Sequence, residues 1–217
     1  MERRWSRAAA TLTLCVAAVF STCYAAGERT QRYAVELANM AIDTHLLTRA
    51  GTTPAQRARL QAKIFSALGV IGLLAREYLQ EQRESDPRLL AQLRRLQYEY
   101  THGEHAAFAA RLQGLTRRYP VNTQGILPLR DTPQQLGAGK QLYQRLCMAC
   151  HAYPDPHSPA PAPDLFAMAR SLPPVDLIAR LIGGVRGTSA TTLVNPLTNQ
   201  DIANLAVYLK YSAPPKP

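Results

Sequence analysis

Apolar side chains recur at helical spacing from about residue 30 to residue 119 of the chain. Start and stop signals separate the runs. Thr53-Pro54 and Asp86-Pro87 each pair an N-cap residue with a proline at the first helical position, and Gly51 and Gly103 follow the ends of two runs. This pattern predicts four amphipathic helices, the first over residues 31–49. The apolar stripes of the other three are Leu60, Ile64, Leu68, Ile71, Leu74 and Tyr78; Leu89, Leu93, Leu96 and Tyr100; and Phe108, Leu112, Leu115 and Tyr119.

Four such helices with short connections would bury their stripes against one another, so we predict an antiparallel helical bundle over residues 28–119. Gly69 and Gly72, inside the second helix, would let another helix approach it closely. Residues 120–131 break the periodicity with Asn122, Gly125 and Pro128, and we interpret them as a linker between two domains.

The second domain, residues 132–217, is also predicted to be helical. Thr132-Pro133 opens one helix, and a proline-rich loop lies over residues 154–163. Helix-like stretches cover residues 165–171 and 175–182. Thr198 with Asp201 resembles a capping box, which would open a last helix ending near Tyr211. Because no stretch alternates as a strand does, the predicted fold class is all-α.

The first 25 residues are typical of an export signal. Three arginines precede an apolar run over residues 8–20, and Cys23-Tyr24-Ala25 provides a small-x-small cleavage site. The run is too short to span a bilayer, so we expect cleavage, a periplasmic protein and no transmembrane segment afterwards. Acylation of Cys23 is an alternative, but Phe20-Ser21-Thr22 is a poor match to the sequence that precedes a lipidated cysteine.

The chain is basic, with 25 Lys and Arg against 15 Asp and Glu, which gives a net charge of +10. Loss of residues 1–25 removes three Arg and one Glu and leaves +8. The arginines are scattered and form no basic cluster, which argues against nucleic-acid binding in an exported protein. We expect redox partner proteins that are acidic at the contact surface, because opposite charge steers association.

Cys147-Met148-Ala149-Cys150-His151 has the spacing of a c-type haem attachment site. Each thiol would add to one porphyrin vinyl group, and His151 would bind the iron from the proximal side. A zinc site would need a second cysteine or histidine pair, and a thioredoxin-like dithiol would need a βαβ context. Cys15 and Cys23 lie in the export signal, so the mature chain keeps only the two motif cysteines. We therefore predict one covalently attached haem c and no disulfide.

Residues 132–212 resemble the class I cytochrome c domain, through this motif and through residues on either side of it. Gly139 and Tyr143 stand in the helix before the motif, and Leu205 and Tyr208 in the last helix, as in that family. Pro163-Asp164-Leu165 is similar to its Pro-x-Leu segment. The resemblance implies a cytochrome c fold in which the carbonyl of Pro163 accepts a hydrogen bond from His151 and Leu165 packs against the porphyrin. The helices before residue 120 resemble no family that we recognise.

The sixth ligand of the iron is left open by the sequence. The family places a methionine before its last helix, whereas residues 191–197 contain none, and Leu193 stands nearest to that place. Met148 lies inside the motif and cannot reach the distal side. The other candidates are weak, and they are Met168, Met40, His45, His102, His105 and His157.

From these features we expect a monohaem c-type cytochrome that carries single electrons in a periplasmic redox chain and is not an enzyme. Two alternatives remain: a haem-based ligand sensor or binder with an open distal site, and a cytochrome subunit docked by its helical domain onto a larger redox complex. A four-helix cytochrome c′ is rejected, because 66 residues follow His151 and form a further fold.

Overall fold

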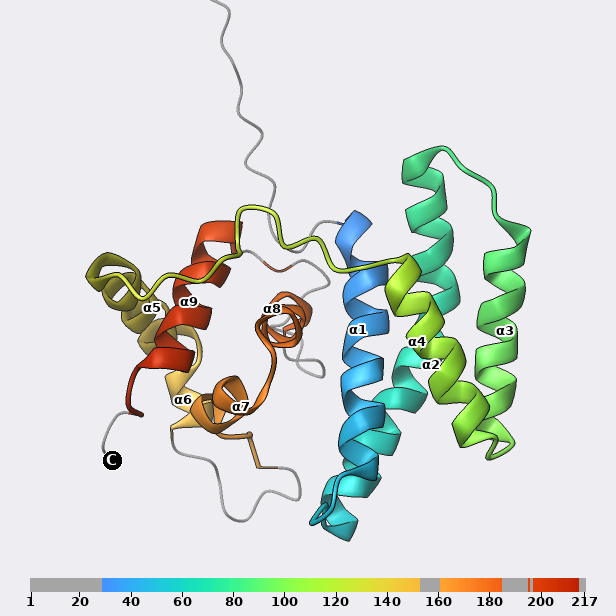
Figure 1. Cartoon of the computed structure of the whole chain (residues 1–217), viewed down its shortest axis with the longest axis horizontal. Helices are drawn as coiled ribbons and strands as arrows, with labels where there is room; N and C mark the ends of the chain where they lie inside the picture. The colour runs from blue at the N-terminus through green and yellow to red at the C-terminus, as the bar shows by residue number, and fades with distance from the viewer. Residues whose placement is uncertain (1–28, 153–160, 185–194, 196, 215–217) are drawn as a thin grey trace, which may run out of the picture.

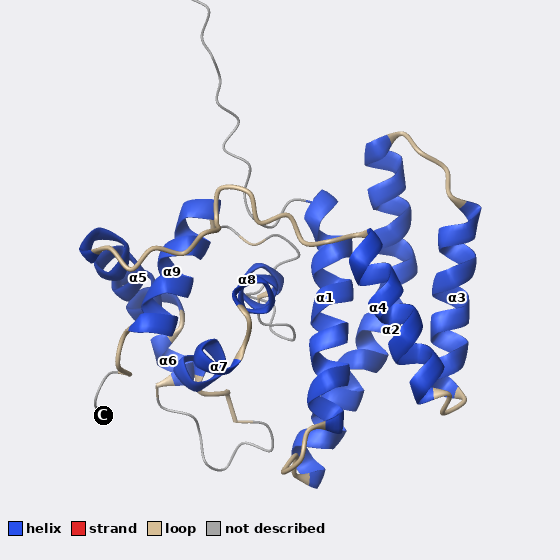
Figure 2. Cartoon of the chain, in the orientation of Figure 1, coloured by secondary structure: helices blue, strands red, loops and turns tan. Residues whose placement is uncertain are grey.

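The computed structural model describes residues 29–152, 161–184, 195 and 197–214. All regular structure in these residues is helical, which confirms the all-α prediction (Figures 1 and 2). The described helices are α1 (Arg29–Thr48), α2 (Pro54–Gln82), α3 (Pro87–Thr101), α4 (His105–Arg118), α5 (Pro133–Leu146), α6 (Met148–His151), α7 (Leu165–Ser171), α8 (Pro174–Gly183) and α9 (Asn199–Tyr211).

The N-terminal ends of four helices are set by the capping residues that the sequence predicts. The side chains of Thr53, Asp86 and Thr132 each accept a hydrogen bond from a backbone N–H in the first turn of α2, α3 and α5. Thr198 and Asp201 form a reciprocal capping box at the start of α9. These bonds satisfy amides that have no partner inside their own helix, and they fix where each helix begins.

Helices α1 to α4 surround one apolar core, formed by the stripes read from the sequence (Figure 1). Helix α1 packs against α2 and α4, and α3 packs against the same two helices. Near one end of this core the rings of Tyr33, Tyr78 and Tyr119 lie with their centroids 5.2 to 5.6 Å apart. The antiparallel order of the bundle stays a prediction, whereas the shared core is observed.

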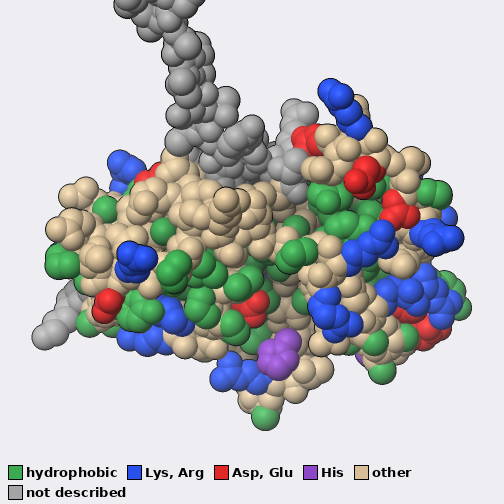
Figure 3. Space-filling model, turned by 45° about the horizontal axis from the view of Figure 1, so that its top comes forward, with side chains coloured by type: hydrophobic (Ala, Val, Ile, Leu, Met, Phe, Trp, Pro, Cys, Tyr) green, Lys and Arg blue, Asp and Glu red, His purple; other side chains and the backbone are tan. Residues whose placement is uncertain are grey.

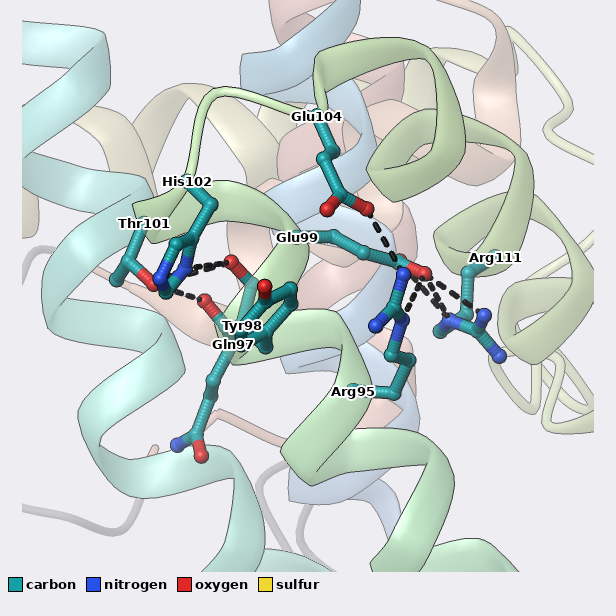
Figure 4. Close-up of polar contacts among 8 residues, drawn as sticks. All are labelled: Arg95, Gln97, Tyr98, Glu99, Thr101, His102, Glu104 and Arg111. Carbon is teal, nitrogen blue, oxygen red and sulfur yellow. Dashed lines mark hydrogen bonds and ion pairs between the residues drawn. The ribbon is translucent and has the colours of Figure 1, made fainter.

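One carboxylate is buried between α3 and α4. Glu99 is almost fully buried, and Figure 4 shows Arg95 and Arg111 directed at it. The guanidinium group of Arg111 donates two hydrogen bonds, of 2.9 and 2.7 Å, to the two Glu99 oxygens. The pKa of Glu99 is lowered, mainly by Arg111 and against the effect of burial, so the charged form is kept. This paired charge ties α3 to α4.

Helices α5 and α9 cross at Gly139. A Cβ atom there would overlap with the backbone carbonyl oxygen of Asn204 and would come within 2.6 Å of the Tyr208 Cβ. Tyr208 continues the contact, because its ring lies 5.7 Å from that of Tyr143 and 5.5 Å from that of Phe166. The absence of a side chain at Gly139 therefore allows the two helices to approach, and the aromatic rings fill the core beside the crossing.

The two helical regions are joined by a buried contact between α1 and α8. The amide of Asn39 donates to the carbonyl of Ala179 at 3.3 Å, and Arg180 forms an ion pair with the buried Asp43. A Cβ atom at Gly183 would overlap with the side-chain nitrogen of Asn39, so glycine permits this approach. The surrounding core is formed by Val35, Ile126, Ile178, Ile182, Ile202 and Ala203.

The predicted linker contributes to the same contact. Ile126 is 3% exposed and belongs to the core between α1, α8 and α9. Asn199, at the start of α9, donates to the carbonyl of Gln124 at 3.0 Å. This segment is therefore packed rather than free, although the boundaries at residues 120 and 131 stay a prediction.

Among the described helices, α2 alone is long and apolar enough to cross a membrane. Core helices of proteins outside membranes also reach this composition, and α2 supplies Ile64, Leu68 and Ile71 to the core. Only 33% of its apolar window is buried, however. The length and apolar composition of α2 are therefore weak evidence against the predicted absence of a transmembrane segment.

Replacing Gly139 by alanine is expected to lower the free energy of unfolding by about 3 kcal/mol, because the added methyl group meets backbone rather than a movable side chain. Gly137 in the same helix is exposed and has nothing within 4 Å of its Cβ position. Gly137→Ala should therefore stabilise the protein by up to about 1 kcal/mol through helix propensity. Urea denaturation of both variants measures the difference in the free energy of unfolding. Equal changes in the two variants would contradict the close approach of α5 and α9 at Gly139.

Replacing Asp43 by alanine leaves the half-buried charge of Arg180 without its partner, and we expect a loss of about 3 kcal/mol. Glu104→Ala breaks an exposed ion pair with Arg95 and should cost less than about 1 kcal/mol. The double variant Asp43→Ala/Arg180→Ala should lose less than the sum of its single changes. Strict additivity in denaturant titrations would show that the two side chains do not interact.

Candidate haem-binding site

The attachment motif occupies a single turn of helix. Cys147 ends α5 and begins α6, since its N–H donates to the carbonyl of Tyr143 at 2.9 Å. Its own carbonyl accepts from the N–H of His151 at 3.0 Å. The continuous path from α5 into α6 thus presents two thiols and one imidazole on one short segment. Cys147 is half-buried and Cys150 is exposed, and both are free thiols.

Cys147 lacks the electrostatic character of a redox-active thiol. Burial, and to a smaller extent the neighbouring Cys150, raises the pKa of Cys147 to about 11. Redox-active cysteine pairs have a lowered pKa, because the thiolate is the reactive species. The electrostatic surroundings therefore favour neither thiol–disulfide exchange nor a thiolate ligand at Cys147, in agreement with the argument from sequence.

The ring of His151 is oriented by a backbone carbonyl. Its Nδ1 lies 2.8 Å from the carbonyl oxygen of Pro163. Because a carbonyl can only accept, Nδ1 must carry the proton and donate it, which leaves the lone pair on Nε2 for a metal. The contact is the one that the resemblance implies, and the role of Pro163 in holding a haem stays a prediction.

Three further interactions fix the position of Pro163. Asp164 caps α7, because its Oδ1 accepts from the N–H groups of Phe166 and Ala167 at 2.8 and 3.0 Å. Leu165 is 8% exposed and is anchored in the core of the second domain. From the other domain, Arg59 of α2 donates to the carbonyl of Pro161 at 3.1 Å. The segment that carries this carbonyl is thus held by the start of α7 and, two residues before Pro163, by Arg59 of α2.

The incompletely buried apolar side chains of this domain suit a flat apolar group. Seven of them are only partly buried, although they pack against the core of this domain, and Leu146 is 51% exposed. Leu165, predicted to contact a porphyrin, belongs to the same cluster. Together with the free Nε2 of His151, this arrangement fits a haem bound at Cys147, Cys150 and His151. The seven partly buried side chains are Leu129, Cys147, Met148, Met168, Leu172, Leu181 and Leu197.

The other candidate ligands are spread over the molecule. Met40 is 1% exposed within the core of α1 to α4, so it is a packing residue. His45, His102 and His105 are exposed on the helical domain, and the ring of His102 stacks on Tyr98 with centroids 3.9 Å apart. Met168 is half-buried beside the core of the second domain, and His157 falls outside the described residues. Leu193, which stands where the family places its methionine, also falls outside them.

Sequence reasoning did not identify Arg59, nor the packing of α1 on α8. Arg59 stands in an amphipathic helix among several other arginines, and 102 positions separate it from Pro161. No local pattern marks a contact of this kind, because it depends on how the two domains dock.

Residues 134–209 match the family model described as cytochrome c oxidase, cbb3-type, subunit III. The match extends from α5 to α9 and includes none of α1 to α4. Neither the curated proteins nor the solved structures give a match to the chain.

Replacing Asp164 by alanine removes the cap of α7 and is expected to cost about 1 kcal/mol of stability. Because Pro163 precedes this cap, its carbonyl should also hold the imidazole less firmly, so the Nδ1 proton of His151 should exchange faster with water. Proton NMR of the reduced, haem-loaded protein measures that exchange. Asp164→Asn keeps a capping oxygen and serves as the control. Equal exchange rates in both variants would contradict this role for the cap.

Proposed function

We propose, from the c-type cytochrome domain that residues 134–209 form, that the protein carries one covalently attached haem and passes single electrons between partner proteins in the periplasm. Such a domain indicates electron transfer rather than catalysis. The observation that carries the proposal is the fixed imidazole of His151, with its Nε2 free beside two thiols on one helical turn.

Each residue of the site has a defined task. Cys147 and Cys150 would hold a haem through two thioether bonds, and His151 would supply a nitrogen ligand to its iron. The haem itself supplies a reversible one-electron couple. The carbonyl of Pro163 accepts a hydrogen bond from Nδ1 and so keeps the imidazole in one tautomer and one orientation, which would tune the iron from the second coordination sphere. Leu165 and the apolar side chains beside it exclude water and lower the local dielectric.

The site has an edge that a partner can reach. Cys150 is exposed and Leu146 is 51% exposed. Apolar side chains at such an edge allow close contact with a redox partner. The positive net charge of the chain would draw it toward an acidic contact surface and raise the rate of encounter. Export through residues 1–25 would place this exchange in the periplasm.

Binding of a small ligand at the iron is the second candidate function. It is favoured by the sequence of residues 191–197, which lacks methionine, and by the burial of Met40 in the other domain. An iron with one open position would bind a diatomic molecule, and the polarity of the distal side would decide which one.

Covalent attachment is tested by Cys147→Ser, Cys150→Ser and the double variant, each produced in a host that matures c-type cytochromes. Each single variant should keep one thioether, and the double variant should release its haem on acid extraction. Met148→Leu lies between the two cysteines and should keep both bonds. Intact mass and pyridine haemochrome spectra give the readout. Retention of covalent haem by the double variant would exclude this attachment site.

Carbon monoxide separates the two candidate functions. An electron carrier with a sixth protein ligand should show a low-spin reduced spectrum that carbon monoxide leaves unchanged. An open site should bind carbon monoxide within the mixing time, with a shift of the Soret band. The spectrum of the reduced protein is measured with and without carbon monoxide. Rapid binding would contradict the electron carrier with a sixth protein ligand and support the ligand-binding function.

A further inference from the structure

Helix α2 presents an apolar face that nothing in the described residues covers. Phe65 is 65% exposed, Leu73 is 58% exposed and Val70 is 40% exposed, and all three lie opposite the side that α2 buries in the core. Figure 3 shows hydrophobic side chains exposed among charged side chains of both signs on the half of the molecule formed by α1 to α4. Large apolar side chains gathered on one helix face mark an interaction surface more often than scattered ones do.

This face borders a groove of about 300 Å³ between α2 and α3. Gly69 and Gly72 lie along it, and nothing approaches within 4 Å of the Cβ position of either. At Gly139 and Gly183, by contrast, a Cβ would overlap with a neighbour inside the chain. Two helix-interior glycines weaken α2 by about 1 kcal/mol each relative to alanine, and no contact within the described residues requires them. The groove has the shape that lets a second backbone come close.

The charges beside the groove are positive and unneutralised. Arg76 from α2 and Arg94 from α3 both line it, and neither has a hydrogen bond or ion pair within the described part of the chain. By contrast, Arg95, Arg111 and Arg118 of the same domain all pair with carboxylates. A ligand that combines an apolar surface with carboxylates would satisfy both features of the groove.

We propose that the groove between α2 and α3 binds an amphipathic helix of a partner protein, with acidic residues along the edge of its apolar face. A helix fits because side chains at positions i, i+3, i+4 and i+7 would lie along the glycine floor between Phe65 and Leu73. Glutamate or aspartate at its edge would pair with Arg76 and Arg94. The surface is separate from the haem edge, so a partner bound here leaves that edge accessible.

Two other occupants fit less well. A second copy of this chain would bring the same pair of arginines against each other, and like charges at an interface disfavour association. A bilayer would contact the protruding Phe65 and Leu73 but would leave the concave floor at Gly69 and Gly72 unfilled. The recess and its two cations together favour a helix over either alternative.

The test uses the full mature, haem-loaded protein and a fluorescent synthetic helix of about five turns, with leucine and alanine on one face and glutamate along its edge. A matched peptide carries lysine in place of glutamate. The acidic peptide should bind at least about tenfold more tightly than the basic one. In the variant Arg76→Glu/Arg94→Glu this preference should reverse, which only a direct charge contact at the groove explains.

A second variant tests the groove itself. Gly69→Leu fills the floor and should weaken binding of the acidic peptide about tenfold, whereas Gly114→Leu, at another open helical glycine, should leave it unchanged. Thermal unfolding shows that each variant is folded. Equal binding of both peptides would overturn the proposal. So would binding to phosphatidylglycerol vesicles in place of the peptide, or a dimer that Gly69→Leu converts to a monomer.

Discussion

The account depends on one hydrogen bond, from Nδ1 of His151 to the carbonyl of Pro163. It fixes the tautomer of the imidazole and thereby assigns Nε2 to the metal. The bond requires that the segment around Pro163, 12 residues after His151, be held in place. Several parts of the chain contribute to this. Asp164 caps the helix that follows the loop, Leu165 anchors it in the core, and Arg59 reaches it from the other domain. The attachment motif is local in sequence, but the orientation of His151 thus depends on contacts made elsewhere in the fold.

Helix α1 connects that environment to the rest of the molecule. One side of it supplies Tyr33, Leu37 and Met40 to the core of α1 to α4, and another side packs on α8. The ion pair between Asp43 and Arg180 lies in this contact, where a displaced partner would leave a charge in an apolar setting. The pair therefore specifies one docking position of the two domains. The helices α1 to α4 thus contact the cytochrome domain through α1, and they present an apolar surface of their own on α2.

The features that could be predicted from the sequence are those that depend on residues close together along the chain. Helix starts follow from caps such as Thr53 and Asp86, which bond within three residues, and the stripes follow from the helical period. The attachment motif is likewise local, and the resemblance supplied Pro163. Contacts such as that of Asn39 with Ala179 could not be predicted, because the sequence does not distinguish an asparagine that faces solvent from one that contacts another domain. The burial of Ile126 could not be predicted either, because this residue stands in a segment rich in turn-forming residues. The sixth ligand stays open, since His157 and the segment around Leu193, where the family places its methionine, fall outside the described residues.

A spectroelectrochemical titration of the mature protein tests the central claim most directly. If the second domain holds one haem through His151, the α-band absorbance should follow a single one-electron Nernst curve, and the curve should be the same on oxidation and reduction. Protein from a host that matures c-type cytochromes is required. Two separate transitions, or no haem absorbance at any potential, would contradict the account.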